Sequence, residues 1–178
     1  MKNISAPASL SGAPLAELKR WLSITTTGED ELLTGLIAGA LSLCERFTGI
    51  VPLKCDVRET LPATRDPCWL AAVPHIALLE AVAVAGLERR MLDAADFELV
   101  LAGDGRASFA LTQAIDEPQI ELHYLAGQAS EWEAVDEGLR QGVIRHAAHL
   151  YRQREENGVT DLPASVAALW RPWRKLRL

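Results

Sequence analysis

The clearest helical signal lies at residues 139–151, which read LRQGVIRHAAHLY. The apolar residues of this stretch recur at three- and four-residue steps: Leu139, Val143, Ala147 and Leu150. This spacing places them on one face of an α-helix. Upstream, Ser130 and Glu133 have the spacing of a capping box, so we expect the helix to start near Trp132.

A second helical stretch follows at residues 162–174, which read LPASVAALWRPWR. Pro163 suits the start of a short helix, which we predict over Ala164–Trp170. Two further helices are predicted near the beginning of the chain, over Pro14–Ile24 and Glu29–Phe47, because each carries a Leu-rich apolar stripe at helical spacing. The sequence therefore predicts about four helices.

Between residues 51 and 128 the pattern changes to short segments separated by turn residues. Five of these segments are predicted as strands: Val57–Leu61, Ala77–Val84, Phe97–Leu101, Ser108–Leu111 and Gln119–Leu125. Gly103, Asp104 and Gly105 are typical of a hairpin turn between two of them. We expect this region to form a small antiparallel sheet.

The predicted fold is α+β and mainly α: a bundle of about four helices with an inserted small antiparallel β-sheet and a C-terminal docking tail. We predict one domain over residues 1–178. Its helices lie at about 14–49 and 131–170, its β-rich insertion at about 51–128 and its tail at 170–178. The chain has 178 residues, 49% of them hydrophobic and 24% charged. These values are typical of a globular domain large enough to bury a core.

The formal net charge of −6 is unevenly distributed along the chain. Residues 1–139 contain ten Lys or Arg and twenty-one Asp or Glu, and carry −11. Residues 140–178 contain eight Lys or Arg and three Asp or Glu, and carry +5. This asymmetry indicates that the basic end contacts a different surface from the acidic body. An acidic chain is also a poor candidate for wrapping nucleic acid by charge alone.

The C-terminal tail combines aromatic and basic residues. Its candidate partner-binding residues are Trp170, Arg171, Trp173, Arg174, Lys175, Leu176, Arg177 and Leu178. Trp and Arg are enriched at binding hot spots, so one interpretation is a peptide that docks into a partner. In that case we expect removal of residues 170–178 to leave the fold intact. The alternatives are that both Trp side chains pack back on the core, or that the tail is a nucleic-acid arm.

No residue pattern points to catalysis, a cofactor or a metal. His146 and His149 lie three residues apart on the predicted helix, but no Cys cluster or carboxylate pair accompanies them, so we interpret them as surface or interface histidines. His75 and His123 have no base, nucleophile or orienting partner that the sequence identifies. Acidic residues are scattered, so no pair can be nominated for acid–base chemistry.

The three cysteines, Cys44, Cys55 and Cys68, are widely spaced and form no CxxC pair. We interpret them as free thiols in a reducing compartment. The first residues show no secretory signal, and no apolar run is long enough for a transmembrane helix, so no membrane contact is expected.

The order of parts and the C-terminal motifs together resemble a known family. The more specific motif is AAHLY at residues 147–151, followed by the pattern P-x-x-V-x-x-L-W-R-P-W-R at residues 163–174. With the N-terminal helix pair and the β-rich insertion, it resembles the head–tail connector (adaptor) proteins of long-tailed bacteriophages and of prophage-derived gene transfer agents.

The resemblance implies a structural role in the neck of a virion or gene transfer agent particle, after synthesis in the bacterial cytoplasm. Such proteins form a ring, commonly of twelve copies, that joins the portal protein to the stopper or tail-completion protein. DNA passes through the lumen of that ring without sequence-specific binding. The resemblance implies that the C-terminal segment grips the portal, and it implies no catalysis, metal or cofactor.

The charge pattern adds a hypothesis of its own and leaves an alternative open. An acidic body could line a channel through which DNA slides, because repulsion limits binding to phosphates. The alternative is a small intracellular nucleic-acid-associated regulatory module that uses the basic C-terminal end. An enzyme is the third class, and no constellation of residues supports it.

Overall fold

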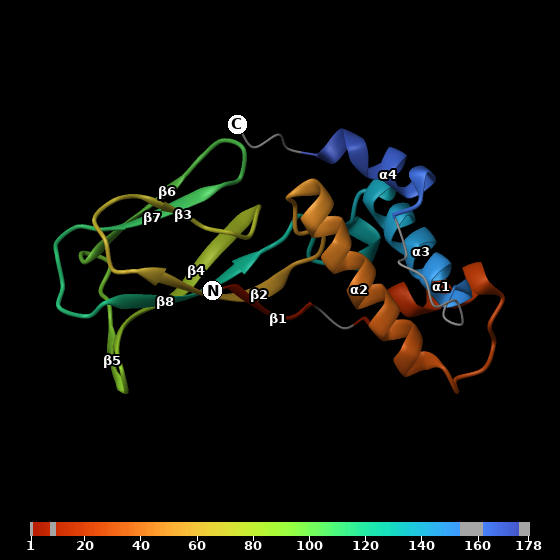
Figure 1. Cartoon of the computed structure of the whole chain (residues 1–178), viewed down its shortest axis with the longest axis horizontal. Helices are drawn as coiled ribbons and strands as arrows, with labels where there is room; N and C mark the ends of the chain where they lie inside the picture. The colour runs from red at the N-terminus through yellow and green to blue at the C-terminus, as the bar shows by residue number, and fades with distance from the viewer. Residues whose placement is uncertain (1, 8–9, 154–161, 175–178) are drawn as a thin grey trace. The chain divides into compact units, whose positions relative to one another are not determined.

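The computed structural model describes residues 2–7, 10–153 and 162–174, and contains four α-helices and eight β-strands in these ranges. The chain divides into two compact units. The β unit comprises Met1–Pro7 and Lys54–Gln128, and the helical unit comprises residues 8–53 and 129–178. Figure 1 shows the strands of the first unit and the helices of the second.

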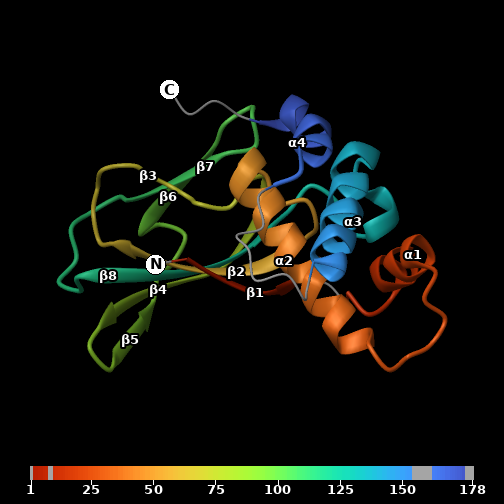
Figure 2. The ribbon, with the colours of Figure 1, turned by 45° about the vertical axis from the view of Figure 1, so that its right-hand side comes forward.

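The helical unit is organised around α3. Its elements are α1 (Ala13–Leu22), α2 (Asp30–Thr48), α3 (Glu137–Arg152), α4 (Ala164–Trp170) and the short 3₁₀ turns η1 (Trp132–Ala134) and η2 (Arg171–Trp173). Helix α3 packs against α1, α2 and α4, as both ribbon views show (Figures 1 and 2). The apolar stripe that predicted α3 therefore faces three other helices.

The boundaries of α2 follow from its terminal residues. Asp30 and Glu31 lie in the first turn, where the helix dipole favours negative charge. Gly49 ends the helix with a left-handed backbone, at φ +76°. Lys19 of α1 donates to the Asp30 carboxylate at 2.6 Å, which ties the last turn of α1 to the first turn of α2.

Helix α3 starts later than the sequence predicts. The residues around Trp132 form the separate turn η1, and α3 begins after Asp136, whose carboxylate accepts a hydrogen bond from the Gly138 N–H at 2.8 Å. Trp132 is buried, and its Nε1 donates to the Glu17 carboxylate at 2.7 Å. The predicted start at Trp132 is wrong because an Asp N-cap begins the helix.

The core of the helical unit draws side chains from all four helices. Its fully or almost fully buried members include Leu18, Leu33, Ile37, Leu139, Val143, Ile144, Val166 and Trp170. Complete burial of one aliphatic side chain of this kind stabilises a fold by roughly 1.5–3 kcal/mol. In the described ranges, no helix has the length and apolar character needed to cross a bilayer.

The chain leaves the helical unit and returns to it at adjacent points. Leu53 and Ala129 form a parallel β-bridge, and the Ala129 N–H donates to the Pro52 carbonyl at 3.2 Å. Residues 54–128, which belong to the β unit, lie between these two points.

Five strands of the β unit form one antiparallel sheet. They are β1 (Lys2–Pro7), β2 (Cys55–Pro62), β4 (His75–Ala85), β5 (Glu88–Met91) and β8 (Gln119–Ala126), and their order across the sheet is β1-β2-β8-β4-β5. Burial alternates along β2 and β8, so one face of these strands is buried and mostly apolar, with Glu59 as its acidic member, and the other face is more exposed.

The other three strands form a second antiparallel sheet. Its order is β3 (Cys68–Trp69), β7 (Ala107–Leu111) and β6 (Phe97–Leu101). The turn between β6 and β7 contains Gly105 at φ +83°, where a Cβ atom would lie 2.9 Å from the Cβ of Pro74. Glycine is required here by its backbone conformation and by this close approach, as expected of the predicted hairpin turn.

A buried polar group lies inside the β unit. Glu59 is only 7% exposed, and its carboxylate accepts hydrogen bonds from the Tyr124 hydroxyl at 2.7 Å and the Ala71 N–H at 3.1 Å. The Ala72 N–H donates to the Tyr124 oxygen at 3.3 Å. Burial and the adjacent Glu59 raise the pKa of Tyr124 far above its usual value, so the hydroxyl remains a donor.

The predicted fold class is wrong in its proportions. We expected a mainly helical bundle with a small inserted sheet, but the insertion contributes seven strands, β1 adds an eighth, and together they form two antiparallel sheets. The five predicted strands are all present. Three further strands and a division into two sheets make the β part a compact unit with its own core.

Candidate functional site

The C-terminal segment, defined here as residues 170–174, is positioned by α4. Pro163 precedes this helix, which spans Ala164–Trp170 as predicted, and Pro172 lies in the 3₁₀ turn η2 that continues from it. Proline fits the first turn of such a short helix because it has no N–H to leave unpaired.

Trp170 is part of the helical core. Its side chain is completely buried, and its Nε1 donates to the Leu139 carbonyl of α3 at 3.2 Å. The ring lies over Gly142 of α3 and beside Phe47 of α2, at 6.0 Å between ring centroids. A deletion that begins at Trp170 would therefore remove a core side chain, which corrects our expectation that the fold would survive it.

The remainder of the C-terminal segment is accessible. Arg171 and Arg174 are exposed, and Trp173 is half-buried against the core cluster. The Arg174 guanidinium lies 5.6 Å from the centroid of the Phe47 ring, within cation–π distance. The segment thus presents a basic surface, and the buried Trp170 anchors it to the helical core.

The other four predicted residues, Lys175, Leu176, Arg177 and Leu178, lie outside the described residues. The predicted set therefore divides into one buried anchor, three accessible side chains and four residues outside the described ranges. The involvement of the whole set in portal binding stays a prediction.

The two helical histidines occupy different environments. His146 is 3% exposed and packs edge-on against Trp170 at 6.3 Å, whereas His149 is half-buried. The interpretation of both as surface or interface residues is wrong for His146. Burial lowers the pKa of His146 below its usual value of 6.5, and the neighbouring His149 lowers it further. In the part of the chain that the structure describes, no three His, Cys, Asp or Glu side chains are grouped to hold a metal ion.

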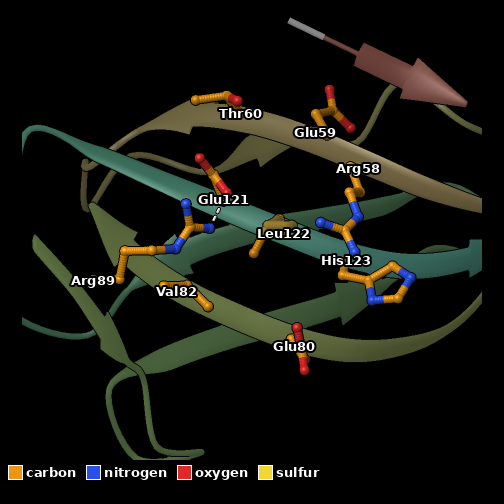
Figure 3. A pocket seen from close by; sticks show the side chains of 9 residues that line it. All are labelled: Arg58, Glu59, Thr60, Glu80, Val82, Arg89, Glu121, Leu122 and His123. Carbon is orange, nitrogen blue, oxygen red and sulfur yellow. Dashed lines mark hydrogen bonds and ion pairs between the residues drawn. The ribbon is translucent and has the colours of Figure 1, made fainter. Parts of the chain in front are cut away.

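The β unit carries a shallow charged hollow of about 190 Å³ on its five-stranded sheet (Figure 3). Arg58 and Glu80 flank His123 on the neighbouring strands, and Arg89 of β5 forms an ion pair with Glu121 of β8. Acidic and basic side chains are thus mixed on this surface, as on a solvated sheet face that carries cross-strand pairs.

His123 has a partner that sequence reasoning missed. Its Nε2 lies 2.9 Å from the Asp56 carboxylate of β2. The two residues are 67 positions apart, and only the register between β2 and β8 brings them together. Both strands were predicted, but alternation along each strand carries no information about the register between them.

Comparison with known proteins gives matches among solved structures. No protein-family model and no curated protein matches the chain. Among the matching structures are three chains of gene transfer agent particles: one from the neck of an empty particle (25% identity, TM-score 0.76), one from the virion of the native particle (26%, 0.74) and one from the neck of the native particle (26%, 0.76). Each alignment covers 100% of this chain and 97% of the other.

The predicted resemblance to head–tail connector proteins is confirmed. The same matches confirm the predicted location in the particle neck, and they support a structural role there. The two neck structures were computed with C6 and C12 symmetry, which supports an oligomeric ring in the particle.

Because His146 is buried in this connector-type chain, we expect the free energy of unfolding to be lower at acidic pH. Because its pKa is lowered on folding, the unfolded chain takes up a proton below about pH 6.5 that the folded chain resists. The free energy of unfolding should therefore fall as the pH decreases from about 6.5 toward the lowered pKa, by up to about 1.4 kcal/mol per pH unit. Denaturant unfolding at about pH 7.5 and about pH 5.5 measures this difference.

The variant His146→Gln should lose this part of the pH dependence, because the amide does not titrate. His75→Gln is the control in the β unit, where burial also lowers the pKa of His75; it should leave the His146 contribution in place. An equal pH dependence in His146→Gln and the unsubstituted chain would contradict the prediction.

Proposed function

We propose that this chain is the adaptor of a phage or gene transfer agent neck, a ring of twelve copies that joins the portal protein to the stopper or tail-completion protein. The observation that carries this proposal is the full-length match to chains of particle necks, one of them computed with C12 symmetry. Its role is structural, and it requires no catalytic residue or cofactor. The two units would act together as one connector domain.

The proposed portal-binding surface is the C-terminal segment with the residues that follow it. Arg171, Trp173 and Arg174 are accessible and combine basic charge with an aromatic ring, as at many protein-binding hot spots. Trp170 would act indirectly, because its burial against α3 holds the segment in place.

The proposed passage of DNA through the ring is supported by charge. The β unit contains seven Lys or Arg and twelve Asp or Glu, a net charge of −5, whereas the helical unit carries −1. A negatively charged wall repels phosphates, so DNA would slide past it without sequence-specific binding.

Truncation after Trp173 tests the portal contact without opening the helical core. The truncated chain lacks Arg174–Leu178, and we combine it with Arg171→Glu while Trp170 is retained. We expect the affinity for purified portal particles, measured by co-sedimentation, to fall by about tenfold or more, because the basic hot spot is removed. Circular dichroism should show unchanged helix content.

The matched control is Arg46→Glu, which reverses an exposed charge of α2 outside the C-terminal segment. This control should sediment with the portal like the unsubstituted chain. If the folded truncated variant does so as well, the proposed portal-binding surface is wrong.

A further inference from the structure

A groove lined by an aromatic ring and by basic side chains lies in the helical unit between α1, α3 and the start of α4. Two adjoining hollows share the Trp21 side chain of α1. We call the second of them the Trp21 groove; it is lined mainly by Trp21, Arg145, His149, Arg152 and Ser165. Trp21 is 43% exposed, so part of its ring is available for contact with another chain.

The basic residues of the Trp21 groove come from one face of α3. Arg145, His149 and Arg152 follow one another at four- and three-residue steps, and the Arg145 guanidinium lies 5.6 Å from the centroid of the Trp21 ring. Among the described residues, no carboxylate forms an ion pair with Arg145 or Arg152. The groove therefore has the chemistry to accept a carboxylate next to an apolar side chain.

The β unit presents an apolar side chain next to a carboxylate at the tip of the β4–β5 hairpin. Leu87 is fully exposed at 101%, beside Gly86 at φ +63°. Glu88 is also exposed and has no cation partner among the described residues, whereas the next residue, Arg89, is paired with Glu121. Figure 1 shows the hairpin projecting from the β unit.

We infer that the hairpin tip of one copy docks into the Trp21 groove of the next copy around the ring. In this contact Leu87 packs on the Trp21 ring and the Glu88 carboxylate pairs with Arg145 and Arg152. Contacts around a cyclic ring of this size are head-to-tail, so each copy must carry two different, complementary surfaces. The inference rests on the proposed ring and assigns these two surfaces to named residues.

A charge exchange across the contact tests the pairing. The measured quantity is the amount of this protein per portal protein in purified particles, for particles produced with each variant. Arg145→Glu alone and Glu88→Arg alone should each lower this ratio by about tenfold, because a like charge replaces an ion pair. The double variant should restore the ratio to within about threefold of the unsubstituted protein, because the pair is re-formed with reversed signs. Arg46→Glu and Glu98→Arg reverse exposed charges elsewhere on the two units and are the matched controls.

Disulfide formation between copies tests the geometry. In a Cys68→Ser background, which leaves only the buried Cys44 and Cys55, we introduce Leu87→Cys with Ser165→Cys. Mild oxidation of assembled particles should produce a ladder of linked chains on a non-reducing gel. Leu87→Cys combined with Arg46→Cys, whose second thiol lies outside the groove, should produce none.

The outcomes separate this inference from the proposed function. A ladder together with charge-exchange rescue supports the contact between copies. Single variants that assemble normally, or a link formed only within one chain, overturn it. A third result also overturns it: the single variants fail to assemble, the double variant does not recover, and no linked chains form. The groove would then bind another neck protein. Absence of the unsubstituted protein from the particle would instead contradict the proposed function.

Discussion

Substitution of Gly142 by alanine is expected to lower the free energy of unfolding of the helical unit by about 3 kcal/mol. A Cβ atom at this position would lie 2.1 Å from Nε1 of Trp170 and 2.7 Å from its Cε2. The indole has little room to move, because it is fully buried and donates to the Leu139 carbonyl. The added methyl group must therefore displace α4 or break this hydrogen bond.

Denaturant unfolding followed by far-UV circular dichroism measures the change, and hydrogen exchange locates it in α3 and α4. Gly39→Ala in α2 is the matched control, because nothing lies within 4 Å of the added Cβ. This control should be neutral or should stabilise the unit by about 0.5–1 kcal/mol through its higher helix propensity. Equal stability of the two variants would contradict the packing of Trp170 on Gly142.

Substitution of Glu59 by alanine is expected to cost the β unit about 3 kcal/mol. The variant leaves the Tyr124 hydroxyl and the Ala71 N–H without their acceptor inside the unit. The Tyr124 hydroxyl is completely buried, so the loss of its acceptor leaves it with an uncompensated desolvation cost. Glu59→Gln, which keeps an acceptor oxygen, should fall between alanine and the unsubstituted chain.

The measurement is denaturant unfolding, with hydrogen exchange of β2 and β8 to locate the loss. Glu80→Ala, on the exposed side of β4 in the same sheet, should change the free energy of unfolding by less than about 0.5 kcal/mol. A loss in Glu59→Ala no larger than that in Glu80→Ala would show that the buried carboxylate does not stabilise the unit.

Much of the secondary structure could be predicted because its patterns are local. Helix α4 spans the predicted Ala164–Trp170, and β6 spans the predicted Phe97–Leu101. Helix α2 spans Asp30–Thr48, within one residue of the predicted Glu29–Phe47 at each end, and Gly49 follows it with a left-handed backbone. Each of these elements is marked by its own periodicity or by its own boundary residue.

Three strands could not be predicted because they lack such a pattern. All four residues of β5 are exposed, so no apolar alternation marks it. Strand β3 has only two residues, and β1 contains a proline and a single large apolar residue, Ile4. Strands β1 and β3 pair with β2 and β7, which lie far away in the sequence, and a single sequence does not reveal such pairing. Strand β5 pairs with the adjacent β4, but its exposed residues give no apolar alternation.

The two tryptophans of the C-terminal motif also could not be assigned from composition. The signal that separates them is position: Trp170 lies four residues after Val166 on α4, and both are buried, whereas Trp173 falls beyond the helix and is half-buried. Helical spacing thus indicates which ring joins the core. The two residues are close together in the sequence, and we therefore predicted that both rings bind a partner.

The bridge between Leu53 and Ala129 bears on how the β unit could be transferred into another protein. Adjacent exit and entry points are typical of a module that can be exchanged as one piece. Here, however, the edge strand β1 comes from the N-terminus and pairs with β2. A transplant of residues 54–128 alone would leave β2 exposed as a new sheet edge, ready to pair with another chain. The transferable piece is therefore discontinuous, and a chimera must carry Lys2–Pro7 along with the insertion.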